Sequence, residues 1–323
     1  EEGAWAEKFS CTYPTVTYPN HISIVTGTWP QIHRCELNPS YAEQRKHIIF
    51  RDYREPVSED IFSIAEKYDI VTALFMAPQS LEDMIGGPKT YRAGLGNARK
   101  NMDDALEFIN KNKTEIESHG LLAFIHLIDS DEIMHEYSTE SDEYRHAIEM
   151  QGNLVGKFIE NITVLGWAND TIVIVTADHA AIGYGHFNRF PTTVCDVPFW
   201  VWGGPIKSGA VIHGGRLIDI GVTVAFALGI PRPADAVGVV LYRLFKEDLL
   251  KEKRGIDNVA DIILDEYKES VNRAYFDCVK YLSGISVMII ITIFVIMDLV
   301  KQRRKLREVV TKLGEGEISG EKG

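Results

Sequence analysis

The segment TIVIVTADHA, residues 171–180, passes from an almost continuous apolar run straight into Asp178 and His179. Apolar runs of strand length without alternation are typical of strands buried on both faces of a parallel sheet. Three further runs are of this kind: IVTALFM (70–76), LLAFIHLI (121–128) and VPFWVWG (197–203). Helix-like stretches alternate with these runs, at 58–68, 101–118 and 141–165. This alternation predicts an α/β protein with a mostly parallel sheet flanked by helices.

Polar side chains follow two of these predicted strands where each strand ends, which is the edge at which open α/β sheets bind ligands. Asp178 and His179 follow one strand, the segment DSDEIMH (129–135) follows another, and His186 comes seven residues after His179. Carboxylate and imidazole groups are suitable ligands for Zn²⁺ or a similar divalent ion. An Asp-His pair taken alone is weak evidence for such a site, because it is more often part of an ordinary surface loop.

A further segment, PTVTYPNHISIVTGTWPQIH (14–33), places Thr17 just before Tyr-Pro-Asn-His. It resembles the nucleophile motif of the type I phosphodiesterase/nucleotide pyrophosphatase family, in the alkaline phosphatase superfamily, where a Thr precedes Phe/Tyr-Pro-Asn-His and opens a helix. TGTWPQIH is likewise similar to the family's TGLYPxxHG. The resemblance implies that Thr17 is the nucleophile, because a bound metal lowers the pKa of a hydroxyl and a helix N-terminus favours phosphate. The alternative for Thr17 is a helix cap alone.

The resemblance continues in chain order through the predicted ligands. DEIMHEYSTES (131–141) is similar to the family's D-S-S-G-H-x-Y-G-P-x-S, and its spacing of four favours Asp131 over Asp129 as the partner of His135. VTADHA is similar to I-S-D-H-G-M, and GYGHFN to G-F-H-G-S. The family's arrangement implies two divalent metal ions, expected to be Zn²⁺: one held by Asp131, His135 and His186, the other by Asp178, His179 and a further carboxylate, with Thr17 beside it.

The family's activity implies a metal-dependent hydrolase that cleaves phosphodiester or pyrophosphate bonds of nucleotides or lipid headgroups. Thr17 would attack phosphorus and form a phosphothreonine intermediate, and Asn20 would donate a hydrogen bond to the charge that develops on a phosphoryl oxygen. Two alternatives stay open. One is a phosphoethanolamine transferase of the glycolipid-anchor pathway, whose similar catalytic domain carries TADHG; the other is an inactive membrane-anchored binding ectodomain.

The remaining histidines and threonines near these motifs are interpreted as structural. His21 is expected to support the site and not to bind a metal. The others are His33, His47, His119, His126, His146 and His213 and the threonines Thr12, Thr15 and Thr26.

The sequence departs from the family pattern at several positions. Met134 stands where Gly precedes the ligand His, Ala180 where Gly follows Asp-His, and Gln151 where Asp is usual. Family members begin with a strand that ends in Asp-Gly, and this Asp completes the ligands of the ion beside Thr17. The chain begins with EEGAW, and no acidic residue among the first sixteen follows a buried-strand pattern. We therefore expect the first strand, with one metal ligand, to be missing from the sequence.

Charge and hydropathy suggest where the chain resides. The 323 residues carry 46 acidic and 34 basic side chains, a net charge of −12, which argues against duplex nucleic acid as a partner. YLSGISVMIIITIFVIMDLV (281–300) has the length and composition of a transmembrane helix, and the basic run KQRRKLR that follows is expected to stay cytoplasmic.

These features predict a catalytic domain at 1–250 outside the cytoplasm, a helical stalk at 251–280, a single membrane span at 281–300 and a basic cytoplasmic tail at 301–323. Glycosylation sequons at Asn112, Asn161 and Asn169 agree with that location. Four cysteines allow at most two disulfides, and the sequence does not indicate how they would pair.

Overall fold

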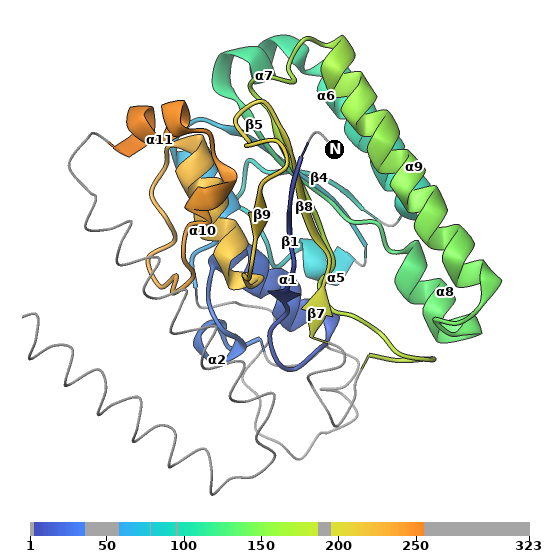
Figure 1. Cartoon of the computed structure of the whole chain (residues 1–323). Coiled ribbons are helices and arrows are strands. Elements are labelled where there is room, and N and C mark those ends of the chain that lie inside the picture. The colour runs from blue at the N-terminus through green and yellow to red at the C-terminus, as the bar shows by residue number, and fades with distance from the viewer. Residues whose placement is uncertain (1–2, 36–57, 78, 95, 187–194, 255–323) are drawn as a thin grey trace, which may run out of the picture. The chain divides into compact units, whose positions relative to one another are not determined.

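A computed structural model describes residues 3–35, 58–77, 79–94, 96–186 and 195–254 (Figure 1). These residues lie within one compact unit, Glu1–Asp265, which contains the predicted catalytic domain. Within the described ranges, no helix combines the length and the apolar character that a membrane crossing requires. The predicted span at 281–300 and tail at 301–323 lie outside the described residues, as does the predicted stalk beyond residue 254.

One group of strands is parallel throughout. It has the order β4-β3-β5 and comprises β3 (Val71–Met76), β4 (Tyr91–Gly94) and β5 (Leu121–Ile125). Residues 72–76 of β3 are buried, as its continuous apolar run predicts. The strands expected at 70–76 and 121–128 are therefore present, and the second ends earlier because the chain turns toward a helix that begins at residue 129.

A second sheet is mixed. Its order is β6 (Ile172–Thr176), β8 (Phe199–Gly203), β1 (Ala4–Ala6) and β9 (Val211–Ile212), with β8 antiparallel to both β6 and β1. A short antiparallel ribbon joins β2 (Phe9–Ser10) to β7 (Asp196–Val197). The prediction of a mostly parallel sheet is therefore wrong for this part. Trp200 is 53% exposed while Phe199 and Val201 are buried, so β8 alternates as an antiparallel strand with one solvated face does.

The first residues of the chain contribute β1 and β2 to these sheets. Glu7 is the acidic residue that follows β1, and its carboxylate pairs with Nδ1 of His213 at 2.8 Å. Both side chains are about half exposed, so Glu7 belongs to the surface and not to a buried ligand set.

Helices cover the strands on two sides. In Figure 1, α6 (Ala98–Lys111) and α9 (Asp142–Val164) lie on one side, and α1 (Thr17–Thr26) and α10 (Ile218–Leu228) lie on the other. The helix predicted at 101–118 is two helices that meet at Asn112, and the one predicted at 141–165 begins after Ser141, whose hydroxyl accepts from Tyr144 N. The shorter helices are α2 (Pro30–His33), α4 (Ile61–Lys67), α5 (Gln79–Glu82), α7 (Lys113–His119), α8 (Asp129–Tyr137), the 3₁₀ helix η2 (Tyr242–Leu244) and α11 (Glu247–Arg254).

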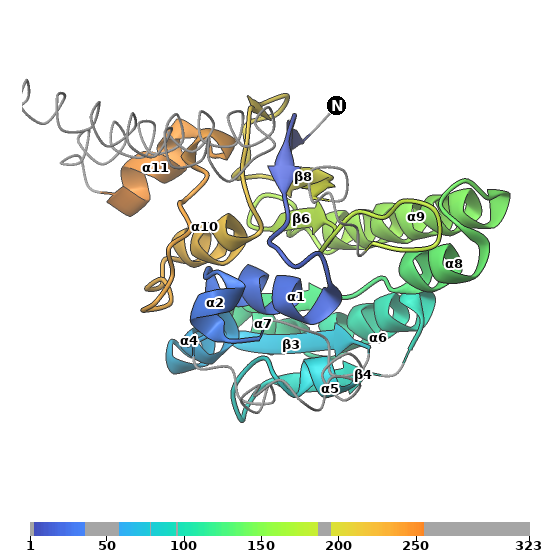
Figure 2. The same cartoon turned by 90° about the horizontal axis from the view of Figure 1, so that it is seen from below.

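The β-layer is interrupted between β5 and β6. Leu122 and Ile174 pack into one hydrophobic cluster and Leu121 and Val173 into the opposite one, so the two strands lie in the same layer. β5 pairs with β3 and β6 pairs with β8, and among the described strands neither has a partner on its other edge. Every residue of these two apolar strands is only half-buried, unlike β3. Figure 2 shows β3 with β4 well separated from β6 with β8.

Candidate active site

Thr17 is the first residue of α1, as the resemblance implied. Val16 precedes it in an extended conformation and has no polar side chain with which to cap the helix. The half-buried Thr17 hydroxyl lies 3.5 Å from Nε2 of His179, which follows β6. Gly27 ends the helix in the left-handed conformation, with φ of 68°. Helix α1 therefore begins at Thr17 and ends just before Gly27.

Asn20 is completely buried one turn into α1 and forms four hydrogen bonds. Its Oδ1 accepts from the backbone N and the hydroxyl of Thr12, both at 2.7 Å. Its Nδ2 donates to the carbonyls of Pro14 and Val16 at 3.1 and 3.0 Å. The amide thus holds the segment that leads into Thr17, and donation to a phosphoryl oxygen, the role predicted for Asn20, would require one of these bonds to break.

We expect Asn20→Ala to lower the free energy of unfolding by about 2–4 kcal/mol, because it leaves buried donors and acceptors without partners. Thermal or urea unfolding measures the change. Asn110→Ala is the matched control: Asn110 is exposed on α6 and makes one bond, to Leu106 O, so its loss should cost less than about 0.5 kcal/mol. Equal effects of the two substitutions would contradict the buried role of Asn20.

Asp131, His135 and His186 form a cluster in which one ligand atom from each residue lies within 4.8 Å of the others. Asp131 and His135 are four residues apart on α8, and their Oδ2 and Nε2 atoms are 3.7 Å apart. Oδ1 of Asp131 is buried and has no hydrogen-bond partner among the described residues. A buried carboxylate oxygen without a partner is costly unless a cation is nearby, so these residues fit a divalent metal ion.

The two imidazoles of this cluster are oriented by the backbone. Nδ1 of His135 lies 3.0 Å from Tyr184 O, and Nδ1 of His186 lies 2.7 Å from Thr15 O. A carbonyl can only accept, so Nδ1 carries the proton in both rings and Nε2 is left with a lone pair for a metal. Thr15 also donates its hydroxyl to His186 O at 2.6 Å. Thr15, which sequence analysis treated as structural, therefore positions a predicted ligand.

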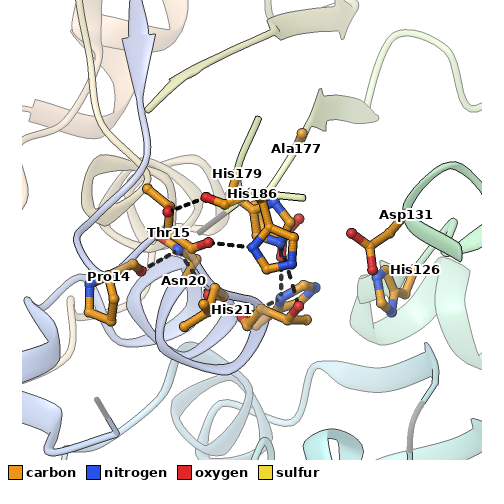
Figure 3. A network of polar contacts seen from close by, with 12 residues as sticks. Pro14, Thr15, Asn20, His21, His126, Asp131, Ala177, His179 and His186 are labelled. Atoms are coloured by element: carbon orange, nitrogen blue, oxygen red, sulfur yellow. Dashed lines mark hydrogen bonds and ion pairs between the residues drawn. The ribbon is translucent and has the colours of Figure 1, made fainter. Parts of the chain in front are cut away.

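His179 lies beside the Thr17 hydroxyl, and Figure 3 shows His21 and His186 close to His179. Oδ2 of Asp178 is 3.2 Å from Nε2 of His179 and 3.5 Å from Nδ1 of His21. Burial acts to raise the pKa of Asp178, but His179, His21, His126 and a backbone hydrogen bond together lower it by more, so the net pKa lies below its ordinary value. Within the described ranges, the ligands predicted for the second ion are one carboxylate, one imidazole and the Thr17 hydroxyl.

His21 and His126 are support residues at this end of the sheet. His21 is 2% exposed, donates from Nδ1 to Thr17 O at 2.9 Å, and its ring centroid lies 4.8 Å from that of His126. Desolvation by burial lowers the pKa of His126 to about 4, and its Nδ1 lies 2.7 Å from Ala77 O. His126 was interpreted from the sequence as an ordinary histidine; its place directly after β5 was the signal that it lies near Asp178, which follows β6.

Two of the departures from the family pattern, Met134 and Gln151, fit their local surroundings. Met134 lies inside the regular helix α8 and is 1% exposed, so no glycine conformation is needed there. Gln151 donates from Nε2 to Leu127 O at 2.8 Å.

Asp129, the alternative to Asp131, accepts from Ala98 N at 2.7 Å at the start of α6 and so lies outside the cluster.

The family model described as "Type I phosphodiesterase / nucleotide pyrophosphatase" matches residues 1–189. The chain belongs to this family. The match contains Thr17 and all five predicted His and Asp ligands. The family is one of phosphodiesterase and pyrophosphatase enzymes that typically use metals, which agrees with the Asp131, His135 and His186 cluster.

Curated relatives of this family are similar over about half of the chain. An uncharacterised pyrophosphatase/phosphodiesterase of Schizosaccharomyces pombe is 25% identical over 182 residues, 52% of this chain and 36% of the relative. Human ectonucleotide pyrophosphatase/phosphodiesterase family member 1 is 24% identical over 188 residues, which are 55% of this chain and 20% of the relative. GPI ethanolamine phosphate transferase 1 of Candida glabrata is 22% identical over 178 residues, which are 49% of this chain and 19% of the relative. The aligned region spans only a fifth to about a third of these relatives.

Solved structures share the fold of this family member. An inactive variant of murine ectonucleotide pyrophosphatase/phosphodiesterase 5, in complex with AMP, superposes with a TM-score of 0.55 and 12% sequence identity, covering 72% of this chain and 88% of the other. The superposition with the human counterpart has the same TM-score at 13% identity and covers 71% of this chain and 88% of the other. The fold of the chain is therefore alkaline-phosphatase-like α/β.

Proposed function

We propose that the chain hydrolyses phosphodiester or pyrophosphate bonds with Thr17 as the nucleophile. The observation that carries the proposal is the position of the Thr17 hydroxyl. It lies at the N-terminus of α1 and 3.5 Å from His179, in a site that also gathers Asp178 and His186. Membership of a family of phosphodiesterases and pyrophosphatases supports the same reaction class.

The N-terminus of α1 is suited to bind the phosphoryl group. The first turn of a helix leaves backbone N–H groups without intrahelical partners, and the helix dipole favours an anion there. Thr17 and Tyr18 carry the first of these N–H groups, while Pro19 has none. A phosphate bound at this end would bring its phosphorus next to the Thr17 hydroxyl.

Asp131, His135 and His186 would hold one divalent ion, expected to be Zn²⁺ from the carboxylate and imidazole donors. Such an ion supplies positive charge that stabilises a phosphoryl oxygen as negative charge develops on it. The protein's own part is to orient both imidazoles: the Tyr184 and Thr15 carbonyls accept from Nδ1 of His135 and His186, which leaves Nε2 as the nitrogen available to the ion.

A second ion at Asp178, His179 and Thr17 would need another ligand, because zinc sites usually have three or four protein ligands and a neutral hydroxyl is a weak one. We propose that a carboxylate at the C-terminal end of an additional strand, seated between β5 and β6, supplies it. Both strands have an unpaired edge within the described part of the chain. Their C-terminal ends lead to His126 and Asp178, so a residue between them would lie beside Asp178.

A nucleotide is the proposed substrate, because a solved structure with the same fold contains AMP. We propose a location outside the cytoplasm with a membrane anchor at 281–300, which stays a prediction from hydropathy and charge.

The test compares zinc-loaded and chelator-treated protein on a nitrophenyl ester of a nucleoside monophosphate and on nitrophenyl phosphate. The expected result is zinc-dependent hydrolysis of the diester, at least about tenfold faster than that of the monoester. A folded chain that binds two zinc ions and still hydrolyses neither ester would overturn the proposal and favour the binding ectodomain. Faster monoester hydrolysis would overturn the diesterase assignment.

Transfer of phosphoethanolamine is the second candidate, favoured by the similarity to the Candida glabrata transferase. Incubation of the protein with phosphatidylethanolamine and a mannose-containing glycolipid distinguishes transfer from hydrolysis. A glycolipid that gains phosphoethanolamine supports transfer, whereas release of free phosphoethanolamine to water supports hydrolysis.

A further inference from the structure

Two cysteines outside the candidate active site lie opposite each other on neighbouring segments. Cys11 directly follows β2, and Cys195 directly precedes β7. In this antiparallel ribbon Phe9 is opposite Val197 and Ser10 is opposite Asp196, so the next pair in register is Cys11 with Cys195. The backbone N of Cys11 donates to Cys195 O at 2.8 Å, which continues the ladder to this pair.

The register satisfies the geometric demand of a disulfide. Directly opposed residues in an antiparallel pair have Cα atoms roughly 4.5–5.5 Å apart, within the roughly 4.4–6.8 Å that a disulfide spans. Each thiol shifts the pKa of the other, which agrees with two side chains that face each other across the ribbon. The register therefore places the two sulfurs within reach of each other.

The two cysteines differ in accessibility. Cys11 is 5% exposed, whereas Cys195 is only partly buried. The hydrogen bond from Cys11 lowers the pKa of Cys195 below that of an ordinary thiol, and the same bond, together with burial, raises the pKa of Cys11. Cys195 is thus the more accessible and more readily ionised thiol of the pair.

We propose that Cys11 and Cys195 form a disulfide that links β2 to β7 by exchange with a low-molecular-weight disulfide such as oxidised glutathione. The Cys195 thiolate attacks one sulfur of the oxidised glutathione, forms a mixed disulfide and expels one glutathione thiolate. Cys11 then loses its proton and attacks the Cys195 sulfur, which forms the Cys11–Cys195 bond and expels the second glutathione. The two cysteines are oxidised by two electrons, and one glutathione disulfide is reduced to two thiols.

The position of the bond connects the two halves of the candidate site. Cys11 precedes Thr12, whose backbone N and hydroxyl hold Asn20, and Cys195 follows the predicted ligand His186 by nine residues. The bond would close a long loop between residues 11 and 195, which restricts the unfolded chain. We expect oxidation to raise the Tm by about 5–10 °C.

Tryptic peptide mapping tests the pairing without any substitution. Trypsin places the four cysteines in separate peptides, residues 9–34, 35–45, 190–207 and 274–280. Reduced full-length protein is equilibrated with oxidised glutathione, its remaining thiols are alkylated, and the digest is analysed by mass spectrometry without reductant. The expected product is peptide 9–34 joined to peptide 190–207, two hydrogens lighter than the sum of the two.

Substitutions distinguish this bond from other pairings. Cys35→Ser is the matched control, because Cys35 is also buried, and it should keep both the linked peptide and the Tm increase. Cys11→Ser and Cys195→Ser should lose both. The proposal is overturned if peptides 9–34 and 190–207 are recovered alkylated, if glutathione stays attached to Cys195 without exchange, or if either cysteine is joined to peptide 35–45 or 274–280.

Discussion

Thr17→Ala should reduce kcat/KM for a nucleotide diester by at least about 10⁴-fold, because the substitution removes the only atom of this residue that can attack phosphorus. Thr17→Ser keeps a hydroxyl at the same place and should retain activity within roughly 100-fold of the wild type. The Tm should change little, since the Thr17 hydroxyl makes one long contact, 3.5 Å to His179. Steady-state kinetics on zinc-loaded protein and thermal unfolding measure the two quantities.

The control for Thr17 is Thr163→Ala, a threonine exposed on α9 whose hydroxyl donates to Ile159 O. This variant should keep kcat/KM within about twofold of the wild type. If Thr17→Ala retained more than a tenth of the wild-type activity, Thr17 would not be the nucleophile and its place at the start of α1 would reflect the helix start alone.

Asp131→Asn should weaken zinc binding at the cluster with His135 and His186 by more than about 100-fold, because it replaces a charged ligand by a neutral amide. The buried Oδ1 of Asp131 has no hydrogen-bond partner among the described residues, so we expect this carboxylate to contribute most of the affinity of the cluster. Calorimetric titration of metal-free protein with Zn²⁺ measures the change. The Tm increase that saturating zinc causes in the wild type should shrink in parallel.

Asp129→Asn is the matched control for this prediction, two residues away on the same helix. Asp129 accepts from Ala98 N through Oδ1, which an asparagine can also do, so both zinc affinity and Tm should stay close to the wild type. The opposite pattern, with binding lost in Asp129→Asn and kept in Asp131→Asn, would transfer the ligand role to Asp129.

Local patterns predicted the elements that carry the site. The apolar run before Asp178 and His179 forms β6, and Thr17 opens a helix as its motif indicates. The spacing of four between Asp131 and His135 puts both on one face of a helix, where two ligands can reach the same ion. Such features depend on residues close in sequence, so they can be recognised without knowledge of the fold.

Other features depend on contacts that a short motif does not reveal. Asn20 was expected to face the substrate, yet Thr12, Pro14 and Val16 use its hydrogen-bonding groups. Thr15 was expected to be structural only, yet it orients His186, 171 residues away. β8 was expected to be parallel, because an apolar run does not reveal the direction of the neighbouring strand.

The sequence by itself determined the α/β class and the family, and it predicted Thr17 as the nucleophile and the metal ligands, with Asp131 favoured over Asp129. These follow from hydrophobic periodicity and short motifs, in which each residue is constrained by its immediate neighbours. Only the tertiary structure decided that His186 meets Asp131 and His135, that backbone carbonyls accept from Nδ1 of both imidazoles, and that Cys11 lies opposite Cys195. The physical reason is that hydrogen bonds and strand register link residues distant in sequence, and no local pattern encodes which of them will meet.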